Sequence, residues 1–252
     1  MNLPVITELQ EWRAHLDAAR GEGRRVGLVP TMGALHGGHL SLIRRAAADG
    51  GMVAVTDYVN PLQFGPSEDL AAYPRRLAAD VRLAAEAGAD VVFAPAPEQM
   101  WPSPPQVSVR VAGLSEILEG AARPTHFDGV ATIVAKLLSI TGPCTAYFGE
   151  KDFQQLALIR RLVEDLSLAA EVVACPTVRD TDGLALSSRN AYLTPAERVV
   201  APQLYWALLA GKRAIEDEGI TDPAAVRERM SQALSGPPPN SPPPNGPPPN
   251  GP

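Results

Sequence analysis

The stretch Val26-Gly-Leu-Val-Pro-Thr-Met-Gly-Ala-Leu-His-Gly-Gly-His-Leu40 joins an apolar strand to an amphipathic helix through a glycine-containing turn. The N-terminus of a helix presents unpaired N–H groups and a partial positive charge, and glycine lets a polyanion approach the backbone closely. His36 and His39 are three residues apart, so they lie on one helix face and add imidazole donors at the same place. This context predicts a phosphate-binding site, whereas an isolated His-x-x-His pair is more often a pair of surface or capping histidines.

The same stretch belongs to an alternation of strands and helices that is typical of a parallel sheet covered on both faces. Polar and glycine-containing segments follow several of the strands at their carboxyl ends, where such sheets bind ligands. The sequence therefore predicts an α/β fold, a doubly wound Rossmann-like parallel sheet. The predicted strands are 26–29, 52–59, 90–94, 107–111, 145–149 and 171–175, and the predicted helices are one that Thr7 caps and that ends near Gly21, then 38–48, 76–87, 128–140 and 152–166.

Composition divides the chain into three regions. Residues 1–177 form the predicted Rossmann-like domain. Residues 178–234 form a smaller region with one helix from Pro195 to about Glu216, bent at Pro202, and a second helix that opens at Asp222-Pro223. Residues 235–252 repeat Pro-Pro-Pro-Asn with Ser or Gly and cannot bury a core. We interpret this tail as an artefact or a linker, and the alternative is a ligand for a proline-binding module.

The overall composition argues against several classes of protein. With 252 residues, 45% of them hydrophobic, the chain can fill an ordinary globular core. The net charge is −6 and no basic cluster is interleaved with aromatic residues, so we expect no nucleic-acid partner. No run is apolar enough to cross a bilayer, and we expect a cytoplasmic protein with no membrane partner. Cys144 and Cys175 fall at opposite ends of predicted strands, so we expect no disulfide. Neither cysteine has neighbours at metal-ligand spacing, so we expect no zinc site.

Two further segments carry groups that suit a phosphate chain. Lys151 lies in Gly149-Glu-Lys-Asp152, where a strand turns into a helix, and a lysine there can bridge phosphates as a point charge. The alternative for Lys151 is a solvated surface side chain. The segment Ser187-Ser-Arg189 offers two hydroxyl groups and a forked guanidinium, although this tripeptide alone is no better than a turn.

Six blocks of sequence occur in order along the chain: Val29–Leu40, Val59–Gly65, Tyr73–Arg75, Arg123–Gly129, Phe148–Gln155 and Leu186–Asn190. Together they resemble the pantothenate synthetase family, one of the nucleotidyltransferase families with a His-x-Gly-His motif. The resemblance covers residues 1 to about 234. It implies that ATP and pantoate give pantoyl adenylate and pyrophosphate, and that β-alanine then attacks the adenylate to release pantothenate and AMP. It also implies a homodimer.

The resemblance assigns roles to individual residues. His36, His39 and Lys151 are the catalytic candidates, because fixed donors stabilise the charge that develops when a carboxylate attacks a phosphate. Gln63 and Gln155 match the glutamines that hold pantoate. The ATP-binding candidates are Pro30, Thr31, Met32, Gly33, His36, Gly38, His39, Gly149, Lys151, Asp152, Ser187, Ser188 and Arg189, and the substrate-binding candidates are Met32, Asn60, Gln63, Tyr73, Arg123, His126 and Gln155.

The metal and histidine assignments have alternatives. Asp80 and Asp152 are the acidic candidates near a Mg²⁺ cofactor that phosphates would mainly hold. Both residues can equally be helix-start or surface carboxylates. His126 can equally be a half-buried histidine with satisfied hydrogen bonds.

Two features depart from the family pattern. Asp57 stands in an otherwise apolar strand where the family usually has an aliphatic residue, and a buried carboxylate must find a partner, reach solvent or take up a proton. Residues 178–234 stop short of the strands that the family would supply, so we expect a partial C-terminal lid domain. Two alternatives to a synthetase therefore stay open: another adenylyl- or cytidylyltransferase, and a nucleotide-binding homologue whose catalysis is impaired by an incomplete lid.

Overall fold

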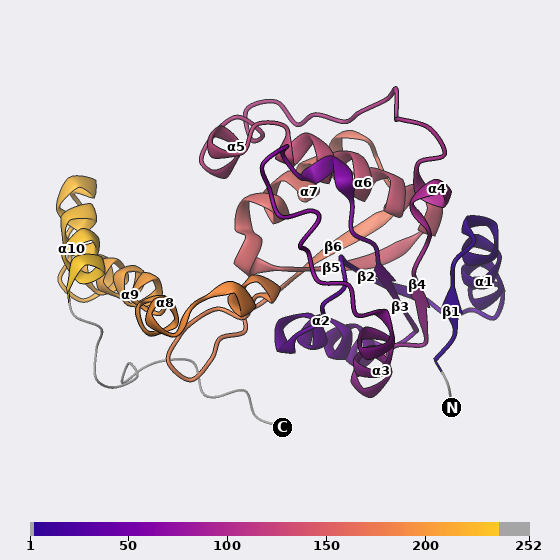
Figure 1. The fold of residues 1–252 in the computed structure, drawn as a ribbon, viewed down its shortest axis with the longest axis horizontal. Helices are drawn as coiled ribbons and strands as arrows, with labels where there is room; N and C mark the ends of the chain where they lie inside the picture. Colours follow the sequence, from indigo (N-terminus) through magenta and orange to yellow (C-terminus); the bar gives the residue numbers. More distant parts are fainter. Residues whose placement is uncertain (1–2, 237–252) are drawn as a thin grey trace. The chain divides into compact units, whose positions relative to one another are not determined.

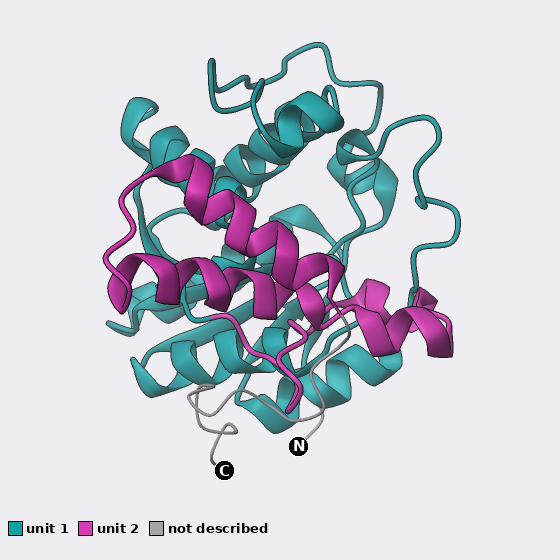
Figure 2. Cartoon of the chain, turned by 90° about the vertical axis from the view of Figure 1, so that its left-hand side faces the viewer, with its two compact units in different colours: residues 1–176 teal, residues 177–252 magenta. Residues whose placement is uncertain are grey.

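The computed structural model describes residues 3–236, and the chain divides into two compact units between Pro176 and Thr177 (Figure 2). The first unit combines a sheet with helices, and the described part of the second unit is mainly helical. The proline-rich repeats from residue 237 onward lie outside the described residues. Within residues 3–236, no helix combines the length and the apolar character needed to cross a membrane.

The first unit is built on a parallel six-stranded sheet with the strand order β1-β4-β3-β2-β5-β6 (Figure 1). The strands are β1 (Val5–Ile6), β2 (Val26–Thr31), β3 (Met52–Asp57), β4 (Val91–Phe93), β5 (Cys144–Gly149) and β6 (Ala170–Cys175). From β2 the chain adds strands first on one side and later, from β5 on, on the other side. The carboxyl ends of β2 and β5 therefore flank the switch point at which such sheets bind ligands.

Helices cover both faces of this sheet, which confirms the predicted doubly wound fold. Helices α1, α6 and α7 pack on one face against residues such as Leu28, and α2 and α3 pack on the other face against residues such as Val29. Neighbouring residues serve opposite faces because side chains alternate along a strand. The helices of this unit are α1 (Leu9–Gly21), α2 (Gly37–Ala48), α3 (Leu77–Ala87), α4 (Pro97–Met100), α5 (Glu119–Ala122), α6 (His126–Thr141) and α7 (Phe153–Asp165), with the short 3-10 helices η1 (Pro61–Gln63) and η2 (Glu150–Asp152).

Two local predictions in the first unit are wrong, and one strand was missed. Residues 107–111 form no strand: Val109 packs against the core, and its N–H donates to the hydroxyl of Thr132 on α6 at 2.9 Å. Thr7 does not cap α1, because the helix begins one residue later and Glu8 occupies the cap position. Strand β1 was not predicted, since two residues are too few to show an alternating pattern.

The second unit contains η3 (Ser188–Tyr192), α8 (Pro195–Val200), α9 (Gln203–Glu216) and α10 (Pro223–Ser235). The prediction of one bent helix across Pro202 is wrong. The chain instead forms two helices, because proline lacks the N–H of a helical hydrogen bond and its ring clashes with the preceding turn. The predicted start of α10 is confirmed: the side chain of Asp222 accepts a hydrogen bond from the Ala224 N–H at 3.0 Å.

Candidate active site

The loop between β2 and α2 is held in an unusual backbone conformation. The Thr31 hydroxyl accepts the Gly33 N–H at 3.1 Å and donates to the Thr56 carbonyl at 2.6 Å. Gly33 and Ala34 have φ angles of +76° and +50°, in the left-handed region that favours glycine. A Cβ atom on residue 33 would lie 2.3 Å from Oδ1 of Asp57. Glycine at position 33 therefore suits both this φ angle and the space left beside the Asp57 side chain.

Asp80, which is buried in the first turn of α3, holds the next part of this loop. Its Oδ2 accepts the Ala34 N–H at 2.9 Å and its Oδ1 accepts the Leu35 N–H at 2.7 Å. Asp80 is a candidate metal ligand, but both of its carboxylate oxygens already accept hydrogen bonds from backbone N–H groups. Residues 3–236 contain no cluster of three or more His, Cys, Asp or Glu side chains that could hold a metal. A Mg²⁺ ion would accordingly depend on phosphate oxygens and water for most of its ligands.

The two histidines of the motif present the same ring nitrogen as a donor. Their ring centroids lie 4.1 Å apart, and Nδ1 of His36 accepts the Gly38 N–H at 3.1 Å as the cap of α2. A ring nitrogen that accepts a hydrogen bond carries no proton, so the neutral His36 ring is protonated at Nε2. Nδ1 of His39 is buried and has no partner in the described chain. If His39, like His36, is protonated at Nε2, its buried Nδ1 carries no N–H that would lack a hydrogen-bond partner.

Lys151 lies close enough to the two histidines to act on their ionisation. Burial lowers the pKa of His36, and the charge of Lys151 lowers it further. Burial lowers the pKa of His39 to about 3, and the charge of Lys151 acts in the same direction, as would the positive charge of His36 when that ring is protonated. Both rings are therefore neutral at neutral pH and can act as hydrogen-bond donors without carrying a charge.

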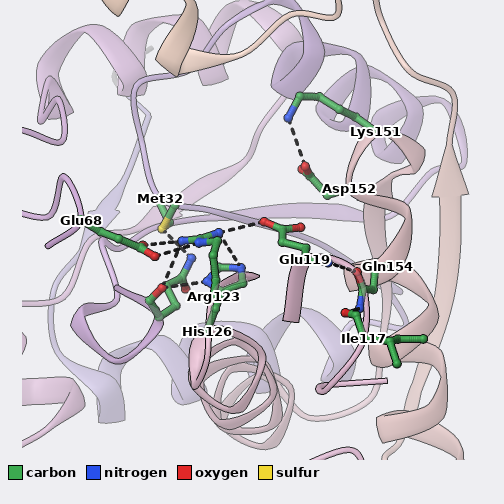
Figure 3. A network of polar contacts seen from close by, with 10 residues as sticks. Met32, Glu68, Ile117, Glu119, Arg123, His126, Lys151, Asp152 and Gln154 are labelled. Carbon is green, nitrogen blue, oxygen red and sulfur yellow. Dashed lines mark hydrogen bonds and ion pairs between the residues drawn. The ribbon is translucent and has the colours of Figure 1, made fainter. Parts of the chain in front are cut away.

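Lys151 and Asp152 lie on η2, directly after β5. The Nζ atom of Lys151 pairs with Oδ1 of Asp152 at 3.1 Å, and their side chains are 37% and 56% exposed (Figure 3). An exposed ion pair of this kind contributes about 0–1 kcal/mol, so an incoming phosphate can replace the carboxylate at little cost.

A second group of side chains surrounds Gln63 at the end of η1. Its Nε2 donates to Sδ of Met32 at 3.1 Å, and its Oε1 accepts from Nδ2 of Asn60 at 3.1 Å. Asn60 is 1% exposed and also donates to the Gly129 carbonyl at 3.2 Å. Residues that follow β2 and β3 thus meet at one place, and the orientation of the Gln63 amide is set by two neighbours.

Arg123 lies at the centre of a network of polar contacts (Figure 3). Its Nε and Nη2 donate to the two carboxylate oxygens of Glu68 at 2.8 and 2.5 Å. Its Nη1 donates to Glu119 at 2.9 Å and lies 3.1 Å from Nε2 of His126, and its Nη2 lies 3.5 Å from the Gln63 carbonyl. A guanidinium has five N–H groups, so each of them has a partner within the chain.

His126 is buried, with 8% of its surface exposed, at the start of α6. Because its Nε2 accepts from Arg123, the proton is on Nδ1, which donates to the Gln63 carbonyl at 2.8 Å. Burial lowers the pKa of this ring, although the bond to Gln63 opposes that shift. These contacts match the alternative of a buried histidine with satisfied hydrogen bonds, and a direct contact of His126 with substrate stays a prediction.

The other predicted residues have more separate surroundings. Tyr73 is buried and packs edge-on against Phe64 at a centroid distance of 5.8 Å. Gln155 is half-buried on α7. In the second unit, the Ser187 side chain caps η3 by accepting the Arg189 N–H at 3.3 Å. A role of residues 187–189 toward ATP stays a prediction.

The sequence reasoning missed three members of the polar network: Glu68, Glu119 and Gln154. The Oε1 atom of Gln154 accepts the Glu119 N–H at 3.1 Å, and its Nε2 donates to the carbonyls of Leu114 and Ile117 at 2.8 Å each. For Glu68 the available signal was its position between two of the six blocks. Gln154 lies inside a block, directly beside Gln155.

A parallel sheet that gathers a glycine-containing helix start, two neutral imidazoles and a lysine at its switch point defines a nucleotide-binding α/β enzyme. The sequence model of the family described as pantoate-beta-alanine ligase matches residues 4–241, and this chain belongs to that family. The resemblance seen in the sequence is thereby confirmed.

Individual relatives agree with this family. Pantothenate synthetase of Rhizobium johnstonii is 50% identical over 234 residues, which are 93% of this chain and 77% of that protein. The crystal structure of pantothenate synthetase from Thermus thermophilus matches with a TM-score of 0.86 and 48% identity, over 92% of this chain and 82% of that one. The pantoate-beta-alanine ligase of Francisella tularensis, solved as a complex with beta-gamma ATP and beta-alanine, matches with a TM-score of 0.80 and 34% identity, over 92% and 86%.

Proposed function

We propose that this chain condenses pantoate with β-alanine at the expense of ATP, and that residues at the carboxyl ends of β2, β3 and β5 carry out the reaction. Membership of the family over residues 4–241 supports the overall reaction. One observation supports the assignment of residues above all others. The rings of His36 and His39 lie together at the start of α2, with centroids 4.1 Å apart, and the charge of Lys151 lowers the pKa of both.

In the first step a carboxylate oxygen of pantoate attacks the α-phosphate of ATP, and the bond to pyrophosphate breaks. Negative charge develops on phosphate oxygens, and the neutral rings of His36 and His39 donate hydrogen bonds to them without transferring a proton. Lys151 leaves Asp152 and binds the phosphate chain as a point charge. Asp152, once released from Lys151, is the carboxylate that would hold a Mg²⁺ ion together with phosphate oxygens, and the ion would supply positive charge to the phosphates.

Pantoate is held by the amides of Gln63 and Gln155, which recognise hydroxyl and carboxylate groups without adding charge. The contacts of Gln63 with Met32 and Asn60 fix its orientation before the substrate arrives. The Gln155 side chain is half-buried on α7, directly after Gln154, and is proposed to present its amide to the substrate.

In the second step the amine of β-alanine attacks the carbonyl carbon of pantoyl adenylate. The new C–N bond forms, the amine loses a proton and AMP leaves.

The hydroxyl groups of Ser187 and Ser188 and the guanidinium of Arg189 are proposed to hold phosphate oxygens of ATP. The resemblance further supports a homodimer, and the composition supports a cytoplasmic location; light scattering of the purified chain tests the dimer.

The experiment that tests this function is pyrophosphate release from ATP and Mg²⁺ with and without pantoate, followed by AMP formation on addition of β-alanine. We expect pyrophosphate release that depends on pantoate and AMP release that depends on β-alanine. Pyrophosphate release with another organic acid but not with pantoate would overturn the substrate assignment. Binding of ATP without pyrophosphate release would identify an impaired nucleotide-binding homologue.

A further inference from the structure

Glu68 lies in the loop between η1 and α3, where it contacts Arg123 rather than either of the two proposed pantoate glutamines. We propose that Glu68 is a positioning residue for the pantoate subsite: its bidentate pair with Arg123 fixes the backbone that carries Gln63. This inference rests on the proposed role of Gln63. It adds to the reaction a residue that acts through the protein and touches neither substrate.

Arg123 has no N–H group left for a ligand. Glu68 takes two donors in a forked arrangement, and Glu119, His126 and the Gln63 carbonyl take the others. Bidentate pairs of guanidinium and carboxylate are directional as well as strong. With side chains only 24% and 23% exposed, the pair of Arg123 and Glu68 is partly shielded from water, unlike a surface ion pair.

The orientation of Arg123 in turn controls the Gln63 carbonyl. Arg123 donates to Nε2 of His126, which leaves the proton of that ring on Nδ1 to bind the carbonyl at 2.8 Å. The preceding residue, Thr125, has a φ angle of +73°, which is strained for a β-branched residue. Strain of this kind persists only where neighbouring contacts hold it.

The same network also reaches the segment that carries the second glutamine, Gln155. Glu119 pairs with Arg123 through its side chain and donates its N–H to Gln154, the neighbour of Gln155 on α7 (Figure 3). A continuous set of hydrogen bonds therefore joins η1 to α7 through Arg123. Glu68 connects this set of hydrogen bonds to the loop that follows η1. Among the described residues, it is the only one that binds Arg123 through both carboxylate oxygens.

The test compares Glu68→Gln with the wild-type chain in pantoate-dependent pyrophosphate release. Glutamine keeps one acceptor and places an NH₂ group against a guanidinium N–H, so one of the two bonds is lost. We expect the KM for pantoate to rise about tenfold, equivalent to about 1.4 kcal/mol, while kcat and the KM for ATP change less than about threefold. Glu68→Asp keeps the charge and is expected to recover part of the pantoate affinity.

The matched control is Glu86→Gln, which alters an exposed Arg82–Glu86 pair on α3 and should leave all three constants unchanged. Arg123→Lys keeps the charge of the partner but loses the fork, and it should reproduce the selective rise in the KM for pantoate. A wild-type KM for pantoate in Glu68→Gln overturns the inference. So does an equal rise of both KM values together with a lower melting temperature, because that is a general structural defect. Failure of the proposed function is a separate result, since the wild-type chain would then lack pantoate-dependent activity.

Discussion

Oδ1 of Asp80 accepts a hydrogen bond from the backbone N–H of Leu35 at an N···O distance of 2.7 Å, although the two residues are 45 positions apart in the chain. The same carboxylate binds the N–H of Ala34, whose φ angle of +50° needs such support. Helix α3 thus holds the loop from which α2 and its two histidines begin. The geometry of the catalytic candidates depends on a residue that contacts neither of them.

Asp80→Asn should lower both stability and activity. Asparagine offers one acceptor oxygen and turns an NH₂ group toward a backbone N–H, so one bond is lost and one buried donor is left unpaired. We expect the free energy of unfolding to fall by about 1–3 kcal/mol. Because the loop then shifts the histidines, we expect kcat to fall about tenfold or more. Urea denaturation and pyrophosphate release measure the two effects.

A magnesium titration of the same variant separates support of the loop from metal binding. If Asp80 acts through the loop, the Mg²⁺ concentration that gives half-maximal activity stays the same. A large rise in that concentration would instead identify Asp80 as a metal ligand.

Gly129→Ala should destabilise the chain, although alanine is normally preferred inside a helix by about 1 kcal/mol. A Cβ atom on residue 129 would lie 2.1 Å from the Leu62 carbonyl oxygen and 2.7 Å from Cα of Gln63. Backbone atoms cannot turn away as a flexible side chain can, so we expect a loss of about 1–3 kcal/mol and a higher KM for pantoate. Denaturant unfolding and steady-state kinetics check both results.

Gly21→Ala is the matched control for this prediction. Gly21 ends α1, and no atom lies within 4 Å of the position where its Cβ would be. This variant should be as stable as the wild-type chain or slightly more stable. If Gly129→Ala behaves in the same way, α6 does not depend on a close approach to η1.

The sheet could be predicted from the sequence because its strands are apolar runs with polar turns at their carboxyl ends. The apolar run 26–29 predicts a strand, and the structure extends that strand to Val26–Thr31. The contacts of Asp80 and Glu68 could not be predicted in the same way. Each binds a partner across a loop, 45 and 55 residues away respectively, and the path of a loop has no periodic signal in one sequence.

Because His39 is neutral, replacing it with glutamine or asparagine tests which ring nitrogen acts as the hydrogen-bond donor. The Nε2 atom of glutamine can take the place of the ring Nε2–H, whereas the amide of asparagine falls nearer to Nδ1. We expect His39→Ala to slow adenylate formation by about 10²–10³-fold, the usual effect of removing one such donor, with little change in pantoate binding. His39→Gln should retain more activity than His39→Asn.

Single-turnover release of pyrophosphate is the measurement, because it reports the first step alone. Since the pKa of His39 is about 3, its protonation should not reduce the wild-type rate between about pH 5 and pH 8. An unchanged rate in His39→Ala, or equal rates in the two amide variants, would contradict a donor role for Nε2.

Asp57 brings a carboxyl group to the end of an apolar strand, and its ionisation should make the stability of this chain depend on pH. It ends β3, its Oδ2 is buried without a partner in the described chain, and burial together with the charge of Asp80 raises its pKa from 3.8 to about 6. Of the three outcomes expected for this carboxyl group, the structure favours uptake of a proton.

The direction of the effect follows from the raised pKa. Below pH 3.8 the group is protonated in the folded and the unfolded chain, and the stability present there is lost as the pH rises through about 6. A shift of about two units corresponds to a loss of at most about 3 kcal/mol. Asp57→Asn, which mimics the protonated group, should therefore be more stable than the wild-type chain at about pH 8 and nearly equal to it at about pH 4. Urea denaturation at both pH values measures this difference, and a gain of the same size under the acidic condition would show that packing, not ionisation, sets the cost of Asp57.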